Sequence, residues 1–156
     1  MRVGVLVNPD AGLGGKLGFK GSDGRAKEAR AAGAEDRAGP RMAQCLSKLD
    51  ELLSSGLNRV NANPEFYTWN GRMGGDWLND FDFIDLGSSP KETSAQDTSR
   101  LVNDLISNQV DIILYAGGDG TTRDIVNAMQ GNETPLIGVP GGVKMHSGCF
   151  ATTPNA

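Results

Sequence analysis

Three glycine-rich segments carry the side chains of this sequence that could do chemistry. The central segment, residues 115–124 (YAGGDGTTRD), places one carboxylate, Asp119, among glycines just before a helical pattern. Glycine lets a backbone approach a ligand closely, and the first N–H groups of a helix attract anions. A carboxylate beside such donors could hold Mg²⁺ or accept the proton of an attacking hydroxyl group. This segment therefore indicates a phosphate site with Asp119 as its candidate catalytic residue.

The other two glycine-rich segments follow the first and the last apolar runs of the chain. They are residues 8–16 (NPDAGLGGK) and 138–148 (GVPGGVKMHSG). Neither the first nor the central segment is a GxxxxGK[ST] loop or a clean GxGxxG fingerprint, so a plain tight turn remains an alternative for each. In the last segment, Lys144 could neutralise phosphate charge and Ser147 could donate a hydrogen bond to it.

Several polar residues have a structural alternative to a functional role. Thr121 could touch a phosphate or only cap the helix that follows it. His146, the only histidine, could be catalytic or a structural hydrogen-bonding residue, and with Cys149 it offers too few ligands for a zinc site. Asp97 is expected in the first turn of a helix, where the helix dipole favours a negative charge.

The elements that must position these segments alternate along the chain. Apolar runs predict strands, and i, i+3, i+4, i+7 spacing predicts helices between them. The strands are expected at residues 3–7, 65–69, 81–86, 111–115 and 136–139, and the helices at 42–53, at 101–106 and after Gly120. This order predicts a Rossmann-like, three-layer α/β fold with a mostly parallel sheet flanked by helices. Residues 19–40 are expected to form a long loop carrying a short helix.

Composition narrows the class of protein. The 156 residues suit one domain, and their 22 glycines gather in clusters. A net charge of −4 argues against nucleic-acid binding, and no stretch approaches the ~18 apolar residues that span a bilayer. Cys45 and Cys149 are expected to be a reduced, cytoplasmic pair. The sequence stops soon after a glycine-rich turn with no element to close the fold, so we expect a piece of a longer protein.

The motifs together resemble the superfamily of NAD kinases, diacylglycerol and sphingosine kinases and phosphofructokinases. Residues 117–121 (GGDGT) match its nucleotide motif residue for residue. Residues 7–24 (VNPDAGLGGKLGFKGSDG), 93–102 (TSAQDTSRLV) and 138–151 (GVPGGVKMHSGCFA) resemble the ATP-NAD kinase-like proteins in particular. The resemblance implies the fold of an NAD kinase N-terminal domain, with ATP or polyphosphate as phosphoryl donor and the 2′-hydroxyl of NAD as acceptor.

The resemblance also implies roles for individual residues. Asp119 would activate the acceptor hydroxyl or organise Mg²⁺. The phosphates would be lined by Gly117, Gly118, Gly120 and Thr121, and the facing loop would be formed by Asn8, Gly12, Gly14 and Gly15. Asp124 stands where the lipid kinases often carry an acidic residue, and a surface carboxylate is its equal alternative.

The sequence departs from the family's pattern in its length. Its members carry a second, largely β domain that supplies much of the acceptor site, so residues 1–156 would be only the N-terminal nucleotide-binding domain. We expect this part to be nearly inactive alone, because phosphoryl transfer depends on positioning both substrates. The resemblance implies small-molecule nucleotides as partners, without a membrane, and leaves a homo-oligomer open.

Two other functions stay open. A kinase of lipid or sphingoid alcohols would share residues 8–12 (NPDAG) and the GGDGT segment, although HSG at residues 146–148 departs from the GTxN pattern of that branch. A nucleotide-binding regulatory module without chemistry would bind ATP even after Asp119→Asn.

Overall fold

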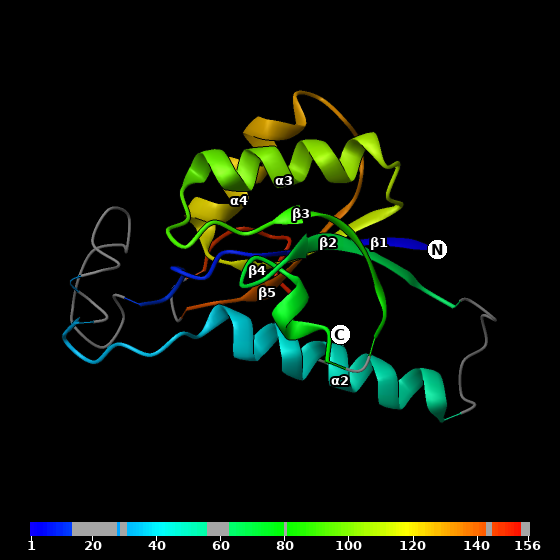
Figure 1. Ribbon diagram of the computed structural model, residues 1–156, viewed down its shortest axis with the longest axis horizontal. Helices are drawn as coiled ribbons and strands as arrows, with labels where there is room; N and C mark the ends of the chain where they lie inside the picture. The colour runs from blue at the N-terminus through cyan, green and yellow to red at the C-terminus, as the bar shows by residue number, and fades with distance from the viewer. Residues whose placement is uncertain (14–27, 29–30, 56–62, 80, 143–144, 154–156) are drawn as a thin grey trace.

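Five parallel strands form one sheet in the part of the chain that the structure describes. The computed structural model describes residues 1–13, 28, 31–55, 63–79, 81–142 and 145–153. The strands lie in the order β3-β2-β1-β4-β5 (Figure 1). They are β1 (Arg2–Val7), β2 (Glu65–Asn70), β3 (Phe83–Ser88), β4 (Ile112–Gly117) and β5 (Leu136–Pro140). The helices are α2 (Ala38–Ser54), α3 (Ala95–Ser107) and α4 (Asp119–Met129), with a short 3₁₀ helix, η1 (Gly75–Trp77).

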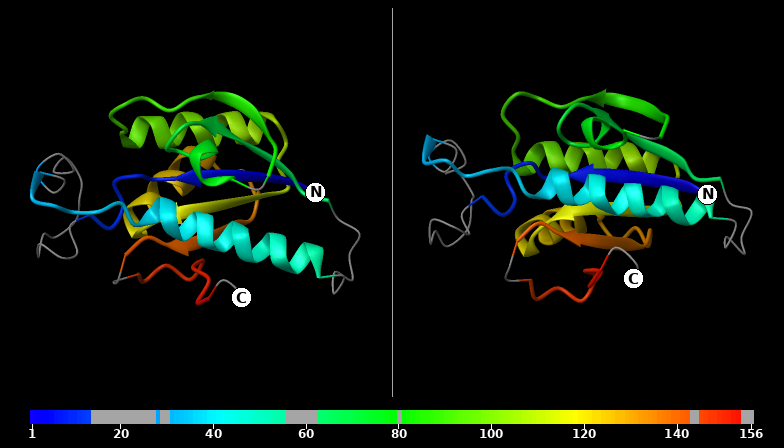
Figure 2. Two further views of the ribbon diagram at one scale, coloured as in Figure 1. Left: turned by 60° about the horizontal axis from the view of Figure 1, so that its bottom comes forward. Right: turned by 90° about the horizontal axis from the view of Figure 1, so that it is seen from below.

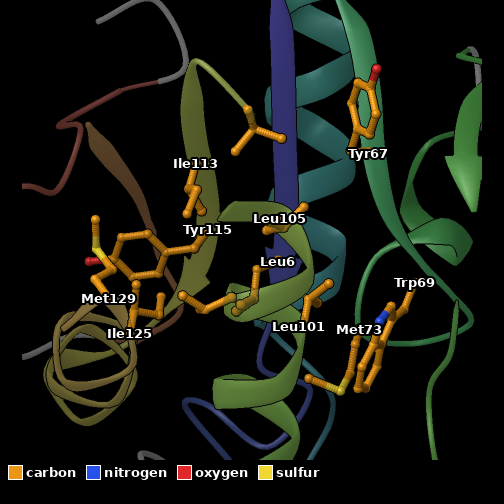
Figure 3. Close-up of a cluster of buried hydrophobic side chains, with 12 residues drawn as sticks. Leu6, Tyr67, Trp69, Met73, Leu101, Leu105, Ile113, Tyr115, Ile125 and Met129 are labelled. Carbon is orange, nitrogen blue, oxygen red and sulfur yellow. The ribbon is translucent and has the colours of Figure 1, made fainter. Parts of the chain in front are cut away.

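Helices cover both faces of the sheet, as the predicted three-layer α/β fold requires. Helices α3 and α4 lie on one face and α2 on the other (Figure 1). Alternate residues of β1 separate the two cores: Leu6 packs with α3 and α4, whereas Val5 and Val7 pack with α2. In the first core, the Leu101 and Leu105 side chains of α3 lie beside Leu6 (Figure 3). Both faces of the central strands are therefore buried, as their apolar sequences predict.

The order of the strands creates a crevice between β1 and β4. From β1 the chain crosses by α2 to β2 on one side, whereas α4 connects β4 to β5 on the other. The connections that follow β1 and β4 therefore lead to opposite sides of the sheet, which makes this a topological switch point, where open α/β sheets bind ligands. The strand arrows of β1, β4 and β5 end on the same side of the molecule (Figure 2).

The link between β2 and β3 differs from the expected alternation of strands and helices. Its described residues form turns and η1. The Trp77 ring of η1 packs so closely on Gly39 of α2 that a Cβ at Gly39 would lie 2.1 Å from its Cζ2 atom. The strand expected at residues 81–86 begins two residues later. Phe81 instead ends a turn and stacks on Phe66, with ring centroids 4.6 Å apart. Apolarity alone therefore misplaced the start of β3, because Phe81 packs against the core that the sheet shares with α2 and is not part of the strand.

Half of the loop expected at residues 19–40 lies outside the described residues, and its last three residues belong to α2. In the ranges that are described, no helix is long and apolar enough to cross a membrane.

The start of α3 is held by a reciprocal cap. Asp97, in the first turn as predicted, accepts hydrogen bonds from the backbone N (2.8 Å) and Oγ (2.7 Å) of Ser94, and it pairs with Arg100. Burial alone would raise the pKa of Asp97, but the hydrogen bonds from Ser94 and Arg100 outweigh it and lower the pKa below its ordinary value of 3.8. A lowered pKa means that the ionised carboxylate stabilises the folded state.

We therefore expect Asp97→Asn to destabilise the protein by about 1–2 kcal/mol at neutral pH. The penalty should shrink as the pH falls from 3.8 through the lower folded pKa, because the wild-type carboxyl then protonates and loses its advantage. Urea unfolding of both proteins across this range measures the effect. A penalty that is independent of pH would contradict the assignment.

Candidate functional site

Asn8, at the end of β1, links the first glycine-rich loop to the segment after β4. Its backbone N donates to the carbonyl oxygen of Ala116 (2.9 Å), and its Nδ2 donates to Oγ1 of Thr121 (2.8 Å). Its Oδ1 accepts from the backbone N of Asp10 (3.0 Å), which turns the chain sharply after the strand. One amide side chain therefore fixes two loops that lie 113 positions apart in the sequence.

The segment 117–121 forms the turn from β4 into α4. Gly118 is the N-cap residue, and Asp119 is the first helical residue. Thr121 is buried, and its Oγ1 accepts from Asn8 and, at 3.4 Å, from the backbone N of Gly118. Thr121 thus supports the turn from its buried side, three residues after the N-cap residue Gly118. The first N–H groups of a helix lack intrahelical partners and form its positive end, so this turn can attract an anion.

The three glycine-rich loops pack backbone against backbone. Gly12 has φ +83°, and a Cβ there would lie 2.0 Å from the carbonyl oxygen of Gly141. The backbone N of Gly141 donates to the carbonyl oxygen of Gly117 (2.7 Å). A side chain at Gly12 would push the first loop away from the third, so this glycine lets the segments meet at one edge of the sheet.

The carboxylate of Asp119 is bound by the third loop. Its Oδ1 accepts from the backbone N of His146 (3.1 Å), the backbone N of Ser147 (2.9 Å) and the Oγ of Ser147 (2.5 Å). Among the described residues, Oδ2 accepts from one donor, the same backbone N of His146 (3.0 Å). The hydrogen bonds from Ser147 are the main reason that the pKa of Asp119 lies below its ordinary value. Asp119 is therefore ionised at neutral pH.

The buried Tyr115 contacts both α4 and the third loop. The hydroxyl of Tyr115 in β4 lies 2.5 Å from Oγ1 of Thr122 in α4 and 3.0 Å from Sγ of Cys149. Burial and the neighbouring Cys149 raise the pKa of Tyr115, which keeps its hydroxyl protonated as a donor. Phe150 also packs against the Tyr115 ring, with centroids 5.8 Å apart. β4 thus fastens both the start of α4 and the third loop.

A cleft of about 430 Å³ opens beside the three touching loops. Its walls come from the loop after β1, the start of α3 and the first turns of α4. They include Asn8, Asp10, Thr93, Thr98, Arg123 and Asp124. The cleft therefore offers hydroxyl groups, two carboxylates and a guanidinium at the carboxyl end of the sheet.

The structure brings together most of the residues that the sequence singled out. The glycines 12, 117, 118 and 120 lie in the touching loops with Asn8, Asp119 and Thr121, and Asp124 lines the neighbouring cleft. Ser147 and the backbone of His146 contact the Asp119 carboxylate, whereas the His146 side chain is exposed. Gly14, Gly15 and Lys144 lie outside the described residues.

Sequence reasoning missed three polar residues around the site. Arg41 of α2 donates from Nη1 to the carbonyl oxygen of Pro140 (2.5 Å), which fastens α2 to the third loop. Thr93 and Arg123 line the cleft. Arg123 follows the GGDGT segment directly, and Thr93 follows a strand end, so position alone could have found these two. Arg41 had no signal, because it contributes to the site only through the fold.

One family model matches the chain. It is described as the ATP-NAD kinase N-terminal domain, and it aligns with residues 3–156. The chain has no significant match among the curated proteins or among the solved structures.

Proposed function

The chain belongs to the family of ATP-NAD kinase N-terminal domains, and on that premise we propose that it binds the phosphates of ATP in an enzyme that phosphorylates NAD to NADP. In this reaction the 2′-hydroxyl oxygen of NAD forms a bond to the γ-phosphorus. The bond from that phosphorus to the bridging oxygen of ADP breaks, and the hydroxyl proton is released. The family is a kinase family; the donor, the acceptor and the residue roles are our proposal.

The observation that carries the proposal is the position of Asp119. An ionised carboxylate stands at the start of α4, beside helix N–H groups and within touching glycine loops. The N–H groups and the helix dipole would bind the anionic phosphates. The carboxylate would serve the cation or the hydroxyl group that accompanies them. The same edge of the sheet thus offers complementary groups to both partners of a phosphoryl transfer.

The oxygen chemistry of the site also fits Mg²⁺. This ion prefers oxygen ligands, and it is usually held by one or two carboxylates together with phosphate oxygens and water. Oδ2 of Asp119 accepts one hydrogen bond from the residues that the structure describes, so it has capacity for such a ligand. The described residues contain no group of three or more His, Cys, Asp or Glu side chains that could hold a metal ion by themselves. When bound, Mg²⁺ would neutralise charge on the transferring phosphate.

The lowered pKa of Asp119 bears on its role. A carboxylate that stays ionised well below neutral pH is a weak proton acceptor, whereas it keeps its full charge for a cation. Of the two roles that the resemblance implies, we therefore favour the organisation of Mg²⁺ and phosphate over proton abstraction. The neighbouring cleft, which Asn8 also lines, would hold the remainder of a nucleotide.

We further propose that a β-rich domain following this chain completes the acceptor site in the full-length protein. The test is the reaction itself. The full-length protein is incubated with Mg-ATP or polyphosphate as donor and with NAD, diacylglycerol vesicles or sphingosine as acceptor. We expect NADP formation from NAD and no transfer to the lipids. Transfer to a lipid alone would assign the protein to the lipid-kinase branch, and nucleotide binding without any transfer would indicate a regulatory module.

A further inference from the structure

The two oxygens of the Asp119 carboxylate have different surroundings. Within the described part of the chain, Oδ1 accepts three hydrogen bonds, two of them from Ser147, and Oδ2 accepts one, from the backbone N of His146 that it shares with Oδ1. Oδ1 is thus satisfied by the third loop, because the two donors of Ser147 already match the roughly two lone-pair sites that one carboxylate oxygen offers. Oδ2 is the oxygen with capacity left for another group.

The loop that holds Oδ1 is itself fastened to the sheet. The backbone N of Gly138 in β5 donates to the carbonyl oxygen of Cys149 (2.8 Å), and the backbone N of Ala151 donates back to the carbonyl oxygen of Gly138 (2.9 Å). This segment runs alongside β5 (Figure 2). Together with the Tyr115 contacts of Cys149 and Phe150, these bonds fix the place from which Ser147 reaches Asp119.

We propose that Ser147 is a positioning residue: its hydroxyl and backbone N hold Oδ1 of Asp119, and thereby direct Oδ2 toward the reacting ligand. The role of Oδ2 rests on the proposed function. The sequence alone indicated Ser147 as a phosphate donor. A serine hydroxyl has one proton, and here it is directed to the carboxylate at 2.5 Å, in a charge-assisted bond. The hydroxyl therefore acts through Asp119 and does not donate to phosphate.

The first test needs no ligand. In isotopically labelled chain, the three-bond couplings from Cγ of Asp119 to its backbone N and carbonyl carbon report whether the side chain occupies one rotamer. We expect single-rotamer values in the wild type, values shifted toward the rotamer average in Ser147→Ala, and recovery in Ser147→Thr, which keeps the hydroxyl. Averaged couplings in the wild type, or unchanged couplings in Ser147→Ala, would overturn the positioning role whatever the nucleotide does.

The second test separates action through Asp119 from direct contact with phosphate. Mg-ATP affinity is measured for the wild type, Ser147→Ala, Asp119→Ala and the double variant. We expect Ser147→Ala to weaken binding about tenfold in the wild type and to change nothing in the Asp119→Ala background, since a shared pathway is non-additive. Equal weakening in both backgrounds would assign Ser147 to the phosphate and overturn the inference. If the wild type shows single-rotamer couplings for Asp119 but does not bind Mg-ATP, the positioning contact is supported and the proposed function is refuted.

Discussion

Replacing Asp119 by asparagine should lower the rate of phosphoryl transfer in the full-length protein about 10³-fold. The substitution removes the negative charge at the start of α4. It puts an amide group where Oδ2 now accepts from the backbone N of His146. The amide oxygen can still accept from Ser147, so the third loop should keep its place and the fold should persist. Steady-state kinetics with Mg-ATP and NAD, together with the melting temperature, measure both effects.

A matched control comes from the other end of the same strand. Asp111 lies just before β4 and accepts a hydrogen bond from the backbone N of Arg2 (2.7 Å). Asp111→Asn makes the same change of charge at the edge of the sheet opposite the site, and it should leave the transfer rate within about twofold of the wild type. If Asp119→Asn retained most of the activity while both variants were folded, Asp119 would not be the catalytic carboxylate.

The second large effect is expected from Gly12→Ala. A methyl group at this position would lie 2.0 Å from the carbonyl oxygen of Gly141, which is backbone and cannot rotate away, and φ of +83° is unfavourable for alanine. Together these terms should cost about 2–4 kcal/mol of stability. That loss corresponds to a melting temperature lower by roughly 5–15 °C. Because the first and third loops must separate, we also expect Mg-ATP affinity to fall at least about tenfold.

The variant Gly33→Ala distinguishes the steric clash from the cost of the positive φ. Gly33 has the same φ of +83°, but a Cβ there would meet no atom within 4 Å. Gly33→Ala should therefore cost only the conformational term, about 1–2 kcal/mol, and leave nucleotide affinity unchanged. Thermal unfolding and calorimetric titration of the two variants in parallel provide the comparison. Equal losses in both would mean that the contact between the loops contributes nothing.

The fold was accessible from the sequence because the local patterns agree with one another. Alternating valines predicted β1, and the nearly all-apolar run at residues 111–115 predicted β4 as a strand buried on both faces. Apolar spacing found α2 and α3, and the glycine turn marked the start of α4. The link through η1 gave no such signal, because it is held by tertiary contacts such as Trp77 against Gly39.

The site was only partly accessible for a related reason. Motif spacing identified Asp119 and the glycines, since the turn from a strand into a helix requires those residue types at fixed positions along the chain. The partner of Ser147 depended on how the third loop folds back along β5, which no local pattern encodes. The contribution of Arg41 likewise exists only once α2 packs beside the end of β5. Residue types were thus predictable, whereas their contacts across the sheet were not.

The most direct test of the nucleotide site is calorimetric titration of this chain with Mg-ATP, followed by a separate titration with NAD. We expect ATP to bind with a dissociation constant in the micromolar to millimolar range. NAD should bind weakly or not at all, because the proposed acceptor domain is missing from the titration. A folded chain that gives no heat with Mg-ATP would contradict the proposal that its glycine loops and Asp119 form a phosphate site.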